Sequence, residues 1–111
     1  MSRIVVACAL LSIALVTALP ASAKLICVRN AGADSLGIRA GHSMFWLDGG
    51  HLRCFRTDED LATLQNWDVQ QCEERDIAVD LREHACLIAA GSDGVCVPEL
   101  ETRQLADACR Q

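Results

Sequence analysis

The stretch GHSMFWLDGGHLRCF, residues 41–55, decides how the N-terminal half of this chain is interpreted. It places two histidines and a cysteine, all possible metal ligands, around an Asp-Gly-Gly sequence. β-Rich segments lie on both sides, at Ser43–Leu47 and Leu52–Arg56. Glycine readily adopts the positive φ that tight reversals require, so this pattern predicts a β-hairpin.

The predicted hairpin argues against a metal site. Whether the turn is 49–50 or 48–49, one face carries Phe45, Leu47, Leu52 and Cys54, and the other carries Met44, Trp46, Arg53 and Phe55. His42 and His51 share the second face but lie about 13 to 20 Å apart, at ~3.3 Å per residue. Cys54 points away from both histidines. We therefore expect neither a metal site nor a cofactor.

Residues 1–23, MSRIVVACALLSIALVTALPASA, are typical of a secretory signal peptide. One arginine precedes an apolar run shorter than the ~20 residues of a spanning helix, and an Ala-Ser-Ala site follows. Cleavage after Ala23 leaves residues 24–111 as a single extracellular domain without a membrane span. That domain has nine basic and 15 acidic residues, a net charge of −6. This charge disfavours nucleic-acid binding and lysis of anionic membranes.

The secreted domain contains an even number of cysteines: Cys27, Cys54, Cys72, Cys86, Cys96 and Cys109. In an exported domain of this size they predict three disulfides. No Cys-x-x-Cys occurs, which argues against a zinc ribbon or a thioredoxin-type redox motif. The spacing alone leaves the connectivity open. Among the possible pairings we favour Cys27–Cys109, because it would join the two ends of the domain.

The remaining pattern predicts an α+β fold, with an antiparallel β-meander in the N-terminal half and helices in the C-terminal half. Strands are expected over 25–29 and 35–39, a short strand over 95–97, and helices over 58–66, 77–90 and 98–110. The alternation of Ile77, Val79 and Leu81 also suits a strand, but the length, the alanines and Gly91 favour a helix. His84 would then be a core or boundary histidine on its apolar stripe.

No arrangement of residues in this sequence indicates catalysis. There is no Gly-x-Ser-x-Gly elbow, His-Glu-x-x-His helix, phosphate loop or dinucleotide fingerprint. The acidic groups at 58–60 and at Glu73, Glu74 and Asp76 are interpreted as a helix-dipole complement and a solvated face. We therefore assign no catalytic residue. The alternative is a small nuclease-like hydrolase or a toxin; the hydrolase would use one of the three histidines with Glu59, Glu73 or Arg53.

Trp46 and Arg53 form the candidate partner patch, because aromatic residues and arginine are favoured at recognition hot spots. The competing interpretation is that C-terminal helices cover this face. The signal peptide, the size and the six spaced cysteines resemble the small secreted cysteine-rich proteins of filamentous fungi, many of which are effectors or killer-toxin-like. Together with the absence of a catalytic motif, these features lead us to expect a secreted, non-enzymatic, monomeric protein that binds an extracellular or host macromolecule, either a protein or a glycan.

Overall fold

The computed structural model describes residues 23–66, 76–91 and 96–110. These residues form eight β-strands and a 3-10 helix, in the order β1 (Lys24–Asn30), β2 (Leu36–Ala40), β3 (Ser43–Leu47), β4 (Leu52–Thr57), β5 (Leu61–Asn66), β6 (Asp76–Asp80), β7 (Cys86–Ala90), β8 (Glu99–Arg103) and η1 (Ala106–Arg110). The structure is mostly β, so the predicted α+β fold with C-terminal helices is wrong.

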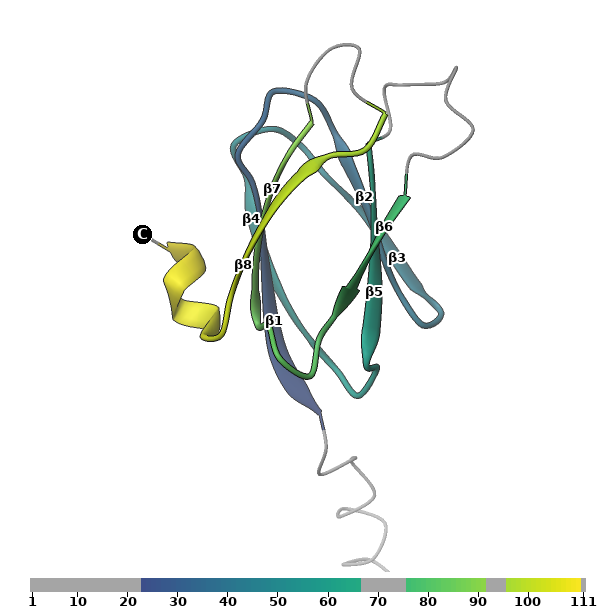
Figure 1. Cartoon of the computed structure of the whole chain (residues 1–111), viewed down its shortest axis with the longest axis vertical. Coiled ribbons are helices and arrows are strands. Elements are labelled where there is room, and N and C mark those ends of the chain that lie inside the picture. The colour runs from purple at the N-terminus through teal and green to yellow at the C-terminus, as the bar shows by residue number, and fades with distance from the viewer. Residues whose placement is uncertain (1–22, 67–75, 92–95, 111) are drawn as a thin grey trace, which may run out of the picture.

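The strands form two four-stranded sheets that face each other as the two layers of a β-sandwich (Figure 1). Sheet A has the strand order β4-β1-β7-β8, and sheet B has the order β3-β2-β5-β6. Most neighbouring strands are antiparallel, but β1 and β7 are parallel, with Cys27 opposite Cys86. Three of the six strand pairings, β1–β4, β1–β7 and β2–β5, join strands that are not consecutive, and the expected meander of consecutive strands does not form.

The main core fills the space between the two sheets. Side chains alternate between the two faces of a strand, so every second residue points inward. The buried residues of this core are Ile26, Val28, Leu36, Ile38, Ala40, Leu47, Ala62, Leu64, Val79, Leu81, Leu87 and Ala89. Both sheets contribute to the set, which makes their inner faces mutually dependent.

A second, smaller cluster lies on the outer side of sheet A. It contains the buried Cys27, Cys86 and Cys109, with Ala106 and Ala108 of η1 packed against them. Figure 1 shows η1 outside sheet A, on the side away from sheet B. Sheet A is thus covered on both faces at this point, which explains why the consecutive residues Ile26, Cys27 and Val28 of β1 are all fully buried.

The helix predicted over 58–66 is replaced by β5. The spacing of Leu61 and Leu64 suggested one helical face, but Leu61 is 59% exposed and Leu64 is fully buried. Ala62 and Leu64 instead alternate inward, as a strand requires. The Thr57 hydroxyl, which was expected to cap this helix, instead accepts a hydrogen bond from Glu59 N (3.1 Å) between β4 and β5. Tertiary pairing with β2 and β6 overrides the helix signal.

The helix predicted over 77–90 is also wrong, and the strand alternative holds for its first part. Ile77 and Val79 lie on β6, a turn follows at 81–83, and β7 begins at Cys86. The predicted helix over 98–110 is replaced by β8 and then η1, so only its last residues are helical. Cys96 and Val97 form a bend rather than a strand.

Several other expectations are resolved by these elements. The strands predicted over 25–29 and 35–39 are confirmed as β1 and β2. Asp76 begins β6 and is exposed, whereas residues 1–22, Glu73 and Glu74 lie outside the described residues. In the described part of the chain, no helix is long and apolar enough to span a membrane.

Candidate binding surface

The opening stretch contains two strands, but they do not form a hairpin. β3 pairs with β2 in sheet B, and β4 pairs with β1 in sheet A. The Asp48–His51 turn, closed by a hydrogen bond from His51 N to Asp48 O (3.2 Å), carries the chain from one sheet to the other. Gly50 N donates to Asn30 O (2.8 Å), and Asn30 N donates to His51 O (2.9 Å). These bonds extend the ladder between β1 and β4.

This crossing reverses the predicted faces of β4. On β3, Phe45 and Leu47 point inward and Trp46 points outward, as expected. On β4, however, Phe55 points inward, and its ring centroid lies 5.1 Å from that of Phe45. Two strands of a hairpin share a sheet, whereas β3 and β4 belong to opposing sheets. The face of each β4 residue is therefore set by its pairing with β1.

Trp46 and Arg53 consequently do not form the adjacent pair that the hairpin predicts. The Arg53 guanidinium lies 4.2 Å from the centroid of the Phe45 ring, at the edge of the sandwich. Trp46 lies on the outer face of sheet B and is 44% exposed. No C-terminal helix covers it within the described residues, since η1 packs on sheet A. Trp46 remains a candidate contact residue, but its neighbours are residues of sheet B and not Arg53.

The three histidines occupy three separate segments. His42 lies in the turn before β3 and His51 lies after the crossing; both are exposed. His84 is half-buried before β7, and its Nδ1 has no hydrogen-bond partner among the described residues. Within those residues no three His, Cys, Asp or Glu side chains gather as a metal site would require. Glu59 is exposed and precedes β5.

Two transverse rows of residues form the outer face of sheet B. The strand registers place Gly37 opposite both Trp46 and Gln65, and Gln65 opposite Asp76. The neighbouring row runs through Met44, Arg39, Thr63 and Ala78. Each row crosses all four strands, because directly opposed residues point to the same face. Residues from four separate segments thus meet on one surface.

A hollow of about 140 Å³ lies on this face, lined by Gly37, Arg39, Met44, Thr63, Gln65 and Asp76. The indole of Trp46 lies over Gly37: a Cβ atom at position 37 would be 2.5 Å from Trp46 Cζ3. Arg39 Nη2 lies 3.5 Å from Met44 Sδ on the same face. The hollow is therefore lined by Met44 at β3, by Gly37 and Arg39 at β2 and by polar side chains toward β6, and the Trp46 indole lies beside it over Gly37.

Sequence reasoning found Trp46 but missed the residues that surround it. Thr63 and Gln65 were assigned to a helix, and Asp76 was interpreted as part of a solvated acidic face. A glycine inside a strand is a signal of close approach by another group. Gly37 carried that signal within the predicted strand over 35–39, although only the register shows that the approaching group is an indole.

A second hollow, of about 230 Å³, is lined by Ala31, Ile88, Ala90, Glu99, Leu100 and Glu101. Glu101 is engaged by Arg103, whose Nη2 lies 3.0 Å from Glu101 Oε1. This hollow combines apolar side chains with two carboxylates. It lacks the side-chain hydrogen-bond donors that Arg39, Thr63 and Gln65 supply in the hollow on sheet B.

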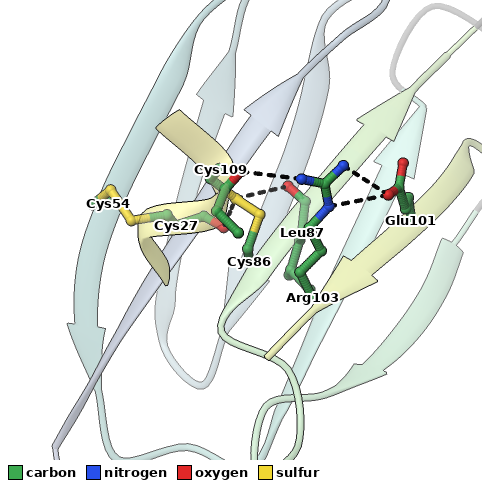
Figure 2. Close-up of a disulfide and its surroundings, with 8 residues drawn as sticks. Cys27, Cys54, Cys86, Leu87, Glu101, Arg103 and Cys109 are labelled. Atoms are coloured by element: carbon green, nitrogen blue, oxygen red, sulfur yellow. Dashed lines mark hydrogen bonds and ion pairs between the residues drawn. A yellow bond between two sulfur atoms is a disulfide. The ribbon is translucent and has the colours of Figure 1, made fainter. Parts of the chain in front are cut away.

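Two disulfides involve strands of sheet A (Figure 2). Cys27 on β1 is bonded to Cys54 on β4, and Cys86 on β7 is bonded to Cys109 on η1. Cys96 is also disulfide-bonded, and Cys72 lies outside the described residues. The favoured Cys27–Cys109 pairing is wrong, although Cys109 Sγ lies 3.3 Å from Cys27 O. The C-terminal η1 does pack against the N-terminal β1, but its disulfide joins it to β7.

No protein-family model, curated protein or solved structure matches this chain. A functional assignment must therefore come from the chemistry of its surfaces.

Proposed function

We propose that this chain is a secreted, non-enzymatic binding protein that recognises an extracellular macromolecule through the outer face of sheet B. The observation that supports this most is the exposure of two large apolar side chains at alternate positions of one strand. Trp46 is 44% exposed and Met44 is 42% exposed. Tryptophan beside arginine is a typical composition of a recognition hot spot, and Arg39 supplies the arginine here.

The surface is built on a rigid support. Opposite the hollow, the inward residues Leu36, Ile38 and Leu64 of β2 and β5 are fully buried in the main core. A contact residue held on such a strand loses little conformational freedom when a partner binds. The site therefore combines exposed apolar groups with a preorganised backbone, as a binding surface requires.

A small hydrolase receives less support from the same geometry. General acid–base catalysis needs two proton-transfer groups within reach of one substrate. His42, His51 and His84 belong to separate segments, and none of them lines the hollow on sheet B. The charged residues of that hollow are Arg39 and Asp76, which suit the orientation of a ligand.

The proposal is tested by Trp46→Ala in the oxidised domain spanning 24–111. Binding is measured on a panel of immobilised insoluble polysaccharides and extracellular matrix proteins, and unfolding by urea is measured on the same samples. We expect at least one member of the panel to bind, with a loss of roughly 30-fold on substitution, equivalent to ~2 kcal/mol. The stability loss should stay well below the ~3 to 5 kcal/mol of a buried tryptophan.

Leu52→Ala is the matched control, because Leu52 is 40% exposed but lies on β4 of the other sheet. It should bind as the unsubstituted domain does. Equal losses in the two variants, or no binding to any member of the panel, would contradict the proposed function.

A further inference from the structure

We infer that the hollow on sheet B is a subsite for one pyranose ring of a neutral glycan. This inference rests on the proposed function and names its ligand class. The ring would stack on the exposed side of the Trp46 indole, which lies over Gly37, and would reach the side chains of Gln65 and Asp76 in the hollow beside it. These four residues lie in one transverse row.

The spacing of the strands leaves room for a single ring next to Trp46. Neighbouring strands lie about 4.8 Å apart, so the Cα atoms of Trp46 and Gln65 are roughly 10 Å apart. Only Gly37 stands between them, and it has no side chain. The Trp46 indole occupies part of this space over Gly37, and the hollow of about 140 Å³ lies beside it, lined by Gln65 and Asp76, where it can admit the edge of a single ring.

The side chains around the hollow match the chemistry of a pyranose ring. A pyranose ring has an apolar face of C–H bonds and a rim of hydroxyl groups that both donate and accept hydrogen bonds. The indole offers a flat apolar surface to the C–H face. Gln65 and Thr63 both donate and accept, Arg39 donates, and the Asp76 carboxylate accepts. This set matches neighbouring hydroxyl groups, which need donors and acceptors together.

The charges in the hollow favour a neutral ligand. Arg39 and Asp76 bring one positive and one negative group into the same hollow, so their charges balance. The domain as a whole has an excess of acidic residues, which opposes the approach of polyanions. A neutral glycan therefore fits better than an anionic one. A protein anchor residue would favour an apolar recess, whereas four of the six lining residues here have polar side chains.

Gly37 is a positioning residue. Its missing side chain lets the Trp46 indole lie close over β2, beside the hollow. An alanine at this position would bring a methyl group to 2.5 Å from Trp46 Cζ3. Since the indole is exposed, it would swing away while the fold remains. Gly37→Ala should therefore impair ligand binding far more than folding.

The test uses titration of the oxidised domain with soluble neutral oligosaccharides: cello-, xylo-, manno-, laminari- and chito-oligosaccharides. A Trp67→Phe background makes Trp46 the source of the indole fluorescence. We expect at least one of these probes to shift that emission to shorter wavelength. Affinity should be about millimolar for one ring and tighter for longer chains. Because the ligand is neutral, the dissociation constant should not change between 50 and 500 mM NaCl.

Variants assign the binding to this hollow. Isothermal titration, which does not depend on the indole signal, should show a tenfold or larger loss in Trp46→Ala, Gly37→Ala and Asp76→Asn. Leu52→Ala and Leu61→Ala, which alter exposed leucines outside the hollow, should bind normally. Unfolding by urea, measured on each variant, confirms that Gly37→Ala is still folded.

Three outcomes would overturn the inference. One is the absence of binding by every oligosaccharide while a matrix protein binds through Trp46, a result that leaves the proposed function intact. Another is sugar binding that survives all three substitutions. The third is binding only of anionic sugars, with an affinity that falls as salt rises. Failure of the proposed function is distinct, because then neither sugars nor proteins would depend on Trp46.

Discussion

At the scale of single residues, Asn30 determines where the two sheets are joined. It lies at the end of β1 and is fully buried. Its Nδ2 donates to Leu47 O (2.8 Å) at the end of β3 and to Asp34 O (2.7 Å), and its Oδ1 accepts from Gly32 N (3.0 Å). A buried amide is costly unless its donors and acceptors are satisfied. Asn30 therefore stabilises the crossing between the sheets.

Asp80 is a second residue whose interactions are local and well defined. Its carboxylate accepts hydrogen bonds from Arg82 Nε (3.1 Å) and Nη2 (2.9 Å), and also from Arg82 N (2.9 Å). The side-chain hydrogen bonds, followed by the backbone one, lower the pKa of Asp80 from 3.8 to about 2. This arrangement closes the turn between β6 and β7.

The lowered pKa of Asp80 predicts a pH-dependent contribution to stability. Between about pH 4 and pH 2 the unfolded chain binds more protons at Asp80 than the folded one does, so stability rises with pH in this window. The contribution is present above about pH 4 and is lost as the pH falls toward 2. We expect Asp80→Asn to flatten this slope in urea unfolding measured from pH 2 to pH 5. Arg82→Gln should flatten it as well, and an unchanged slope in both variants would disprove the assignment.

At the scale of elements, the turn over residues 48–51 differs from a hairpin turn because its two glycines have different structural roles. Gly50 has a φ of +79°, whereas Gly49 is not among the residues with positive φ. Gly49 instead approaches the loop after β1, where an added Cβ would lie 2.6 Å from Gly32 O and 2.7 Å from Ala33 O. One glycine is required for its conformation, and the other for close packing of two backbones.

The two glycines should therefore respond differently to asparagine. Gly50→Asn should cost less than about 1 kcal/mol, because asparagine tolerates positive φ and no atom lies within 4 Å of an added Cβ. Gly49→Asn should cost at least ~1 to 3 kcal/mol, because the backbone oxygens of the neighbouring loop cannot move freely. Urea unfolding of the two variants measures this. A two-residue hairpin turn with positive φ at both positions would give similar costs, which would contradict the crossing.

At the scale of the whole molecule, stability depends on contacts between segments distant in sequence. β1 lies between β4 and β7 in sheet A, and η1, which follows all the strands in the sequence, packs against the outer side of β1. Arg103 Nη1 donates to Ala108 O (3.5 Å), which adds a polar contact between β8 and η1. The Cys86–Cys109 bond closes a separation of 23 residues and holds η1 on sheet A.

Disulfide mapping tests this arrangement directly. A non-reducing digest should contain peptides joined by Cys27–Cys54 and by Cys86–Cys109, with none joined by Cys27–Cys109. The proposed export predicts a chain that begins at Lys24 and gains six hydrogens on reduction, as expected when all six cysteines are paired. The double substitution Cys86→Ala/Cys109→Ala should lower the free energy of unfolding by about 3 kcal/mol. A free thiol in the oxidised domain 24–111, or the Cys27–Cys109 peptide, would contradict the arrangement.

The sequence alone located the N-terminal strands, because alternation along a strand is a local property. It also indicated that Phe45 and Leu47 point away from Trp46, which the structure confirms. The even number of cysteines predicted disulfides, two of which are described. Trp46 was recognised as a contact candidate by its residue type and its position on β3. The inferences about strands and faces depend on neighbours within a few residues, whereas the disulfide inference depends on the cysteine content of the whole domain.

Only the tertiary structure decided which strands pair, and with them the inner face of β4 and the composition of the binding surface. The hydrogen bonds of a strand go to another segment, so a sequence such as 61–66, whose apolar spacing also suits a helix, becomes a strand when β2 and β6 offer partners. Likewise Arg39, Gln65 and Asp76 meet Trp46 only through the register of sheet B. Local periodicity specifies the face on which a side chain lies within its own strand, but which residues share that face depends on pairing between segments that the sequence keeps apart.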